Sequence, residues 1–183
     1  MIFSAIDIIR SELNAFGVSA DLGNIGEIVS GSGTNHGATS DIIISLVNIE
    51  ENRVSRDPQN YIKKESGIMM KNPAVHLYLT LIFAAVRDTG YGIALQKVQQ
   101  VIEFFQRKYV FDHTNTTNLN TGIEKLLLDM VSLNMEQLHQ LWSMLGGKYH
   151  PSVVYRMRMV TVDFLSDQPS SLIKEIEVHH NLK

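Results

Sequence analysis

The chain has 183 residues, 44% of them hydrophobic and 19% charged, which is the composition of a globular protein long enough to bury one core and short for two domains. It carries 16 Lys and Arg residues against 19 Asp and Glu. The resulting net charge of −3 argues against a general nucleic-acid-binding protein, which needs a basic surplus to meet phosphates. Cysteine is absent, which excludes disulfides, thiol chemistry and zinc sites built from Cys.

The N-terminal apolar stretch does not have the pattern of a signal peptide. Charged residues at Asp7, Arg10 and Glu12 interrupt it, whereas a signal peptide needs an uninterrupted apolar core. The longest strongly apolar run elsewhere, near 75–86, is too short to cross a bilayer as a helix. We therefore expect a soluble protein that is made without export and contacts no membrane.

The first third of the chain predicts one helix and one strand. Residues 2–16 have apolar residues at spacings of three and four, which predicts a helix that ends at Gly17. The residues on this face are Ile2, Ile6, Ile9 and Leu13. The segment 18–40 is rich in Gly, Ser and Asn, with a short strand expected at 27–30. Residues 41–52 are predicted to form a strand that is covered on both faces near its start. One side would carry Ile42, Ile44, Leu46 and Asn48, and the other Ile43, Ser45, Val47 and Ile49.

The middle of the chain predicts a long loop or a loose hairpin, then a strand and a helix. Residues 53–70 are expected to form a long loop or a loose hairpin arm, and Pro73 precedes a second long strand over 74–87. Residues 91–108 give the clearest helical pattern. Its buried face is predicted to carry Leu95, Val98, Ile102 and Phe105.

The last third alternates between strands and a capped helix. A strand is predicted over 124–133, followed by a helix over 135–145 that begins with a capping box of Asn134 and Gln137 and ends at a glycine pair. Its apolar face would carry Leu138, Leu141, Trp142 and Leu145. Another strand is expected over 153–164. Residues 166–171 have the composition of a linker, and 172–180 again resemble a strand.

The search for catalytic or metal-binding motifs gives almost nothing. No two histidines form an i, i+4 pair on a predicted helix, so we interpret them as exposed or locally bonded. They are His36, His76, His113, His139, His150, His179 and His180. The sequence around Lys148 lacks the first Gly and the final Ser or Thr of a phosphate-binding loop, and no GxSxG motif occurs. We predict no catalytic residue, no metal and no cofactor.

Two local features have a structural and a functional interpretation. Arg156 and Arg158 alternate on one face of a strand, with Lys148 in the preceding turn, which indicates either a small basic patch or an ordinary solvated or inter-subunit face. Trp142 is predicted to anchor its helix in the core. An enzyme with a dispersed site at the loop 31–37, using His36 and Asp41, is a competing hypothesis.

The segment LWSMLGGKYHPSVVYRMRMVTVD (141–163) resembles the cap, or tube-terminator, proteins of extracellular contractile injection systems, which are particles similar to headless phage tails. The residues that match are Leu141, Trp142, Tyr149, Pro151, Ser152, Tyr155, Arg156 and Arg158. Three further blocks are similar to the same family: SLVNIEENRVSR (45–56), NPAVHLYLTLIFAA (72–85) and VIEFFQRKYVF (101–111). The resemblance covers nearly all of residues 1–164.

This resemblance implies an α+β fold with a single mixed, mainly antiparallel sheet flanked by helices, similar to phage tail-terminator proteins. It implies a structural role without catalysis, as a hexameric ring on the distal end of the inner tube and sheath. The expected partners are copies of the same chain, the tube and sheath proteins, and a paralogous cap protein. Assembly in the bacterial cytoplasm would precede release of the particle. A tail-completion or neck protein of a true contractile-tailed phage is the alternative.

The chain is predicted to divide into a cap domain, 1–165, and a linker with a strand-like arm, 166–183. A segment without a partner strand in its own domain can add to the sheet of a neighbouring protein. We therefore expect this C-terminal segment, 166–183, to bind the sheath. The residues expected to make this contact are Leu172, Ile173, Ile176 and Val178.

Overall fold

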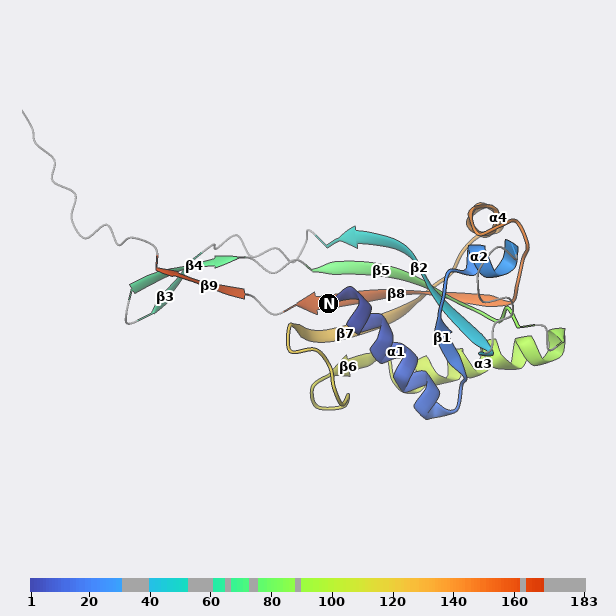
Figure 1. Ribbon diagram of the computed structural model, residues 1–183, viewed down its shortest axis with the longest axis horizontal. Coiled ribbons are helices and arrows are strands. Elements are labelled where there is room, and N and C mark those ends of the chain that lie inside the picture. The colour runs from blue at the N-terminus through green and yellow to red at the C-terminus, as the bar shows by residue number, and fades with distance from the viewer. Residues whose placement is uncertain are drawn as a thin grey trace, which may run out of the picture.

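The computed structural model describes residues 1–30, 40–52, 61–64, 67–72, 76–87, 90–161 and 164–169, which form two sheets and four helices (Figure 1). The elements are α1 (Ile2–Phe16), β1 (Ala20–Leu22), α2 (Ile25–Ser30), β2 (Ile42–Glu51), β3 (Tyr61–Lys64), β4 (Gly67–Asn72), β5 (Leu77–Ala84), α3 (Tyr91–Arg107), β6 (Val110–Asp112), β7 (Ile123–Val131), α4 (Met135–Met144), β8 (Ser152–Thr161) and β9 (Phe164–Pro169). The predicted strands over 41–52, 74–87, 124–133 and 153–164 correspond to β2, β5, β7 and β8. The strands β1 and β6, which have three residues each, were not predicted from the sequence.

The larger sheet has the strand order β1-β2-β5-β8-β7-β6. β1 pairs with β2 in parallel, and every other neighbouring pair in this sheet is antiparallel. The prediction of a mixed, mainly antiparallel sheet flanked by helices is therefore confirmed. The longest strands, β2, β5, β7 and β8, lie next to one another, so residues that are far apart in the sequence share one surface.

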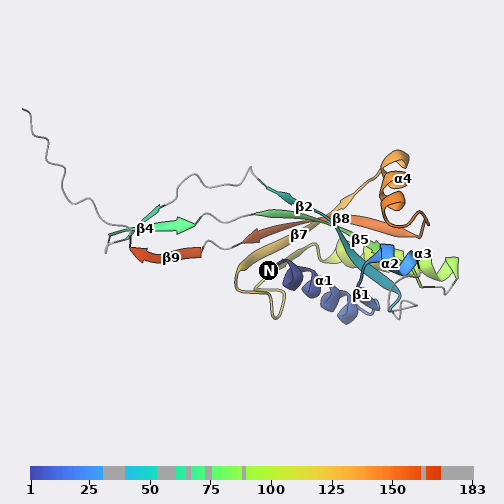
Figure 2. The same ribbon diagram turned by 45° about the horizontal axis from the view of Figure 1, so that its top comes forward.

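Helices cover the two faces of this sheet unequally (Figure 2). α1 and α3 pack on one face around a large core cluster that includes Ile9, Phe83 and Phe105. On the other face, α2 and α4 enclose a smaller cluster that includes Trp142 and Val154. The second pair of helices reaches only one end of the sheet, and none of the described helices covers that face at the end nearer the three-stranded sheet.

The predicted N-terminal helix is confirmed as α1. Ile6, Ile9 and Leu13 are buried against the sheet, and Ile2 is partly buried against the same cluster. Gly17 ends the helix with a φ of 100°, a left-handed conformation that glycine adopts without strain.

The segment 27–30, predicted as a strand, belongs to the helix α2 instead. Asn24 initiates this helix, because its side-chain oxygen accepts a hydrogen bond from the N–H of Gly26 at 3.1 Å and its amide donates to Glu27 at 3.0 Å. Ile25 is then buried in the smaller cluster, with Ile28 packed against it. Both signals of this helix are present in the sequence. They are the capping residue Asn24 and the two apolar residues Ile25 and Ile28, which are three positions apart.

The predicted alternation of β2 holds only up to a bulge at Val47. Leu46 lies opposite Leu81, but Asn48 lies opposite Thr80, so the register shifts by one residue between them. Leu46 and Asn48 therefore lie on opposite faces of the sheet and not on the same face as predicted. The start of the strand is covered on both faces, as expected.

The helix predicted over 91–108 is confirmed as α3, with one error on its buried face. Phe105 is buried, and Val98 and Ile102 pack against the large cluster, but Leu95 is 47% exposed. Figure 1 shows why, since the first turns of α3 extend beyond the ends of β5 and β8. At that end of the helix only the small Ala94 faces the protein and is buried.

A separate three-stranded sheet of β3, β4 and β9 lies beyond the end of β2, β5 and β8 in both views (Figures 1 and 2). We call these three strands the arm. β3 and β4 form an antiparallel hairpin, which confirms the predicted hairpin for the described part of 53–70. The linker predicted over 166–171 is wrong for its first residues, because β9 extends to Pro169 and pairs with β4. The predicted strand over 172–180 lies outside the described residues.

The arm continues the ladder of the two central strands. Leu77 of β5 pairs with Met159 of β8, and Asn72 of β4 pairs with Phe164 of β9. These two pairs are five positions apart on each strand, so the first pairs of β4 and β9 keep the register of β5 and β8, and the register shifts only between Lys71 and Met69. Among the described helices, none is long and apolar enough to cross a membrane.

Candidate functional site

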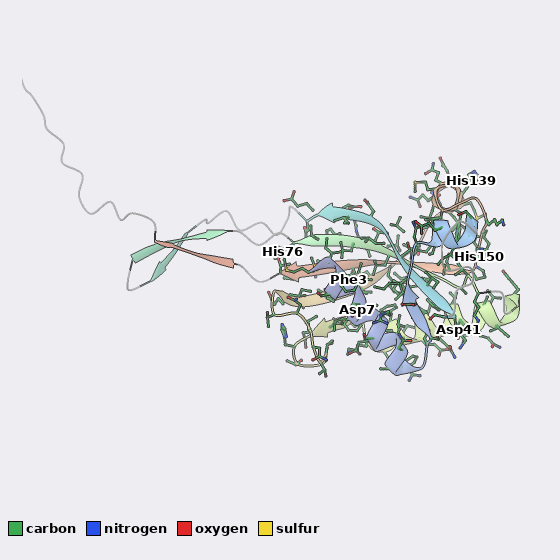
Figure 3. All side chains as sticks on the ribbon, viewed as in Figure 1. Phe3, Asp7, Asp41, His76, His139 and His150 are labelled. Carbon is green, nitrogen blue, oxygen red and sulfur yellow. The ribbon has the colours of Figure 1, made fainter. Side chains whose placement is uncertain are left out.

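The described histidines do not converge on a site. Figure 3 shows His76 at the end of the sheet near the arm and His139 and His150 at the opposite end. His113 is engaged locally, with its Nε2 atom 2.8 Å from the carbonyl oxygen of Ile123. Within the described ranges, no group of three His, Asp or Glu residues could hold a metal ion. His36, His179 and His180 lie outside those ranges.

The competing enzyme site cannot be built from the described residues. The loop 31–37 with His36 lies outside them, and Asp41 is committed to two cations. Its carboxylate is 3.0 Å from Nζ of Lys97 and 3.1 Å from Nη1 of Arg87. Burial alone would raise the pKa of Asp41, but the hydrogen bonds and positive charges of Lys97 and Arg87 outweigh it and lower the pKa below its ordinary value. An ionised, paired carboxylate is a structural group and a poor general base.

The segment 141–151 is organised around Trp142. The α4 helix that carries it begins with the predicted capping box, in which Asn134 accepts from the N–H of Gln137 at 2.8 Å and Gln137 accepts from the N–H of Asn134 at 3.0 Å. Trp142 is 4% exposed, which confirms the predicted core anchor. Its ring lies edge-on to Tyr149 with centroids 5.7 Å apart.

The chain leaves α4 through the predicted glycine pair. Gly146 and Gly147 have φ values of 106° and 77°, a region that favours glycine, and the N–H of Gly147 donates to the carbonyl oxygen of Trp142 at 2.8 Å. The carbonyl oxygen of Pro151 then accepts from the N–H of Ala85 at 2.9 Å, which joins this turn to the end of β5. Ser152 opens β8.

Strand β8 separates a buried aromatic residue from an exposed cation at adjacent positions. The rings of Tyr155 and Phe105 pack together with their centroids 4.4 Å apart. Burial raises the pKa of the Tyr155 hydroxyl. Arg156 lies on the opposite face, where it forms an ion pair with Glu50 and stacks over the ring of Tyr78 at 4.5 Å. Leu141 is buried and Arg158 is half-buried.

The uncovered part of the sheet on the α4 side forms a continuous polar surface, which we call the open face. Cross-strand pairing places residues of β2, β5, β7 and β8 side by side on it. These residues are Asn48, Glu50, Tyr78, Thr80, Leu127, Asp129, Arg156 and Arg158. Each is at least partly exposed. The predicted basic patch is therefore a mixed surface of both signs, and Lys148 lines a different cavity from Arg156.

A groove of about 570 Å³ runs where the open face meets α4. Its apolar lining comes from Val47, Val131 and Val154 of the sheet and from residues in and next to α4. The remaining apolar residues are Leu133, Leu141 and Met144, and the polar ones are Asn48, Glu50, Thr80, Gln137 and Arg156. No local pattern in the sequence indicated this groove.

Comparison with known proteins decides the family. Residues 5–174 match the profile of the family described as the Pvc16 N-terminal domain. The chain belongs to this family. The match contains the whole block 141–163 on which the predicted resemblance depends, and it includes Leu172 and Ile173 but not Ile176 and Val178. No curated protein sequence matches the chain.

Two solved structures have the fold of this Pvc16 N-terminal domain. The first is described as a sheath/tube terminator of the extracellular contractile injection system PVC in its extended state, with a TM-score of 0.57 and 15% identity over 100% of this chain and 65% of that one. The second is the tube-terminating cap of the anti-feeding prophage, with a TM-score of 0.61 and 13% identity over 98% of this chain and 60% of that one. The chain thus spans less than two thirds of the length of either protein.

The predicted resemblance to cap proteins of contractile injection systems is therefore confirmed. The roles of the individual residues stay predictions. The Pvc16 N-terminal domain brings Trp142 and Tyr149 together at one end of the sheet, and it places Arg156 in the groove and on the open face. It does not bring the two groups into a single pocket. The four predicted contact residues of the tail lie outside the described residues.

Proposed function

We propose that the chain is the cap of a contractile injection particle, a ring of six copies that closes the distal end of the inner tube and sheath. The family membership carries this proposal, and both similar structures are described as terminators or caps. Within the described residues no His, Asp or Glu cluster could hold a metal ion, and the carboxylates of Asp41 and Glu50 are committed to ion pairs. The chain would act by shape, without turning over a substrate.

The mechanism is termination by a mismatched surface. Growth of a tube requires that each new ring present the surface on which the next ring stacks. A cap that binds the last ring through one surface and presents a different surface outward stops this repetition. Contacts between unlike surfaces of neighbouring copies close on themselves when the rotation between copies divides a full turn, which gives a finite ring.

The arm and the C-terminal tail are suited to reach the sheath. The tail begins after β9, at the end of a sheet that lies apart from the helices (Figure 1). Its 14 residues, 170–183, could span at most roughly 50 Å when extended. Leu172, Ile173, Ile176 and Val178 would supply the apolar contacts of a strand that joins a sheath subunit. We place assembly in the bacterial cytoplasm, before release of the particle.

Electron microscopy of particles assembled without this chain tests the function. Loss of the cap should give tubes of uncontrolled length or particles without a stable sheath, and supplying the chain in trans should restore a uniform length. Particles of normal length with a normal sheath in the absence of the chain would refute the proposal.

Truncation tests the tail separately, and the structure determines where to cut. A variant that ends at Pro169 keeps β9 paired with β4, whereas removal of residues 166–183 also deletes part of that strand. The shorter truncation should weaken attachment to the sheath and leave the ring on the tube. If chains that end at Pro169 cap sheathed particles as well as the full chain does, the tail does not bind the sheath.

A further inference from the structure

A second cavity, of about 410 Å³, lies at the end of the sheet away from the arm, and we call it the α3 cavity. Its walls are the helix α2, the residues after β5, the start of α3 and the turn between α4 and β8. Figure 3 shows His150, which lines the cavity, at the opposite end of the sheet from His76. The α3 cavity shares no described lining residue with the groove beside α4.

The described lining of the α3 cavity carries cationic side chains and no carboxylate. Arg87, Lys148 and His150 line it, and none of its described lining residues is Asp or Glu. The guanidinium of Arg87 is committed to Asp41, at 3.1 Å. Lys148 and His150 form no hydrogen bond or ion pair with any other described residue. The cavity therefore keeps one ammonium group without a counter-charge and an ionisable imidazole beside it.

The two unpaired groups repel each other when both are protonated. Burial lowers the pKa of His150 below its ordinary value, and the positive charge of Lys148 lowers it further. A bound anion would offset both effects. Because His150 is mostly neutral at pH 7, the pair carries about one positive charge there. One charge matches a single carboxylate better than it matches a phosphate group, which carries close to two.

The first turn of α3 adds hydrogen-bond donors to the same cavity. Gly90 is the N-cap of this helix, and no described side chain caps the N–H groups of its first turn. A Cβ atom added at Gly90 or Gly92 would meet no atom within 4 Å, so the space beside this turn is open. Unpaired N–H groups and the positive end of a helix dipole attract anions. The helix end therefore adds to the attraction that Lys148 and His150 exert.

The remainder of the lining is largely apolar, which indicates an anion that belongs to a larger molecule. Ile28, Val29, Val86 and Pro151 line the same cavity. A free inorganic anion would leave these side chains facing water. The methylene groups of an acidic side chain and its neighbours in a peptide would cover them and contribute to binding.

We propose that the α3 cavity binds an acidic side chain of a neighbouring protein, with its carboxylate facing Lys148, His150 and the first turn of α3. That the anion belongs to a protein rests on the proposed function, since a cap contacts the other proteins of its particle. The contact lies at the end of the sheet away from the arm. It is therefore separate from the proposed contact between the tail and the sheath.

Peptide titration of the purified chain tests the site. The probe is the tripeptide Leu-Glu-Leu with an acetylated and an amidated end, and Leu-Gln-Leu with the same ends is its matched control. Isothermal titration calorimetry should give an affinity about tenfold higher for the glutamate peptide, because only that peptide carries a charge. The single Trp reports the place of binding, since the ring of Trp142 lies 5.8 Å from that of His150 and its fluorescence should change. Inorganic phosphate should bind more weakly than the glutamate peptide.

Substitution of the unpaired lysine tests which charge is used. Lys148→Gln should weaken binding of the glutamate peptide about fivefold. The exposed side chain of Lys148 has no described partner, so its replacement should leave the fold intact, which circular dichroism verifies. Lys125→Gln is the matched control, because Lys125 is also exposed but lies on β7, outside the cavity, and its loss should not change the affinity.

Binding of the glutamate peptide should become tighter as the pH falls from about 8 to 6. A bound carboxylate stabilises the protonated imidazole, so binding raises the pKa of His150 and takes up a proton. The ring of Trp142 also packs against His150. Histidine is the side chain that normally titrates in this range, so His150→Gln should remove the pH dependence and keep the preference for glutamate over glutamine. The other described titratable residues that line the cavity are Arg87, Tyr91, Lys148 and Tyr149.

The outcomes separate this inference from the proposed function. Equal affinity for the two peptides, no measurable binding of either, or equal effects of Lys148→Gln and Lys125→Gln would overturn the inference. Tighter binding of phosphate than of the glutamate peptide would make the cavity a site for small anions and would also overturn it. The cap function stands in each of these cases, because the titration uses the purified chain alone. If the chain is not found at the particle end, the proposed function itself fails.

Discussion

Replacing Trp142 with alanine should destabilise the protein by about 3 kcal/mol. Removal of a buried aromatic side chain costs about 3–5 kcal/mol, and Trp142 is 4% exposed in the smaller core cluster. The lower end of this range applies because its Nε1 atom is buried without a hydrogen-bond partner among the described residues. Such a donor already costs about 1–3 kcal/mol, which the substitution relieves.

Urea denaturation followed by circular dichroism measures this loss. With a slope of about 2 kcal/mol per molar, the midpoint should fall by roughly 1.5 M. Tyr149→Ala is the matched control, since Tyr149 touches the same indole ring but is 57% exposed, and it should cost at most about 1 kcal/mol. A loss below about 1 kcal/mol for Trp142→Ala, or equal losses for the two variants, would refute the conclusion that this residue anchors α4.

Three further substitutions test local features of the structure. Asn134→Ala removes the capping box and should lower the free energy of unfolding by about 1 kcal/mol; the fluorescence of the single Trp, which lies on the same helix, reports it. Gly147→Ala should cost about 1 kcal/mol in denaturant, because its φ of 77° strains any other residue, whereas Gly92→Ala in the exposed first turn of α3 should not destabilise. Asp41→Asn should destabilise at pH 7. Because the pKa of Asp41 is lower in the folded chain than in the unfolded one, its contribution is complete above about pH 4 and is lost as the pH falls through the folded-state pKa. The difference in unfolding free energy between Asp41→Asn and the unmodified chain should therefore shrink at pH 3, and a constant difference from pH 7 to pH 3 would contradict this account.

Local patterns predicted α1, α3, α4 and the long strands because each of these elements is encoded over neighbouring residues, whereas α2 was predicted as a strand. The face of α1, the capping box of α4 and the glycines after it depend on residues within four positions of one another. The bulge at Val47 has no such local pattern, since it exists only relative to β5. The exposure of Leu95 likewise depends on where the sheet ends, which helical periodicity does not report.

The groove was not predictable because its lining is assembled by strand order. Val47, Val131 and Val154 come from three strands that are separated by long stretches of chain, and Met144 comes from the helix between two of them. Only the order β2-β5-β8-β7 brings them together. Arg156 was identified in the sequence as one of two alternating cations, but its ion pair with Glu50, 106 positions earlier, was not.

The shared register of β5–β8 and β4–β9 limits how the length of the arm can change. A single residue inserted on one strand alone would turn every side chain beyond it to the other surface. Related chains with longer or shorter arms should therefore differ by equal numbers on both strands or by an even excess on one, as where β9 has two residues more than β4 between the pairs Lys71–Leu165 and Met69–Pro169. The distance that the arm reaches would then vary in discrete steps, while the side chains presented at its end keep their orientation.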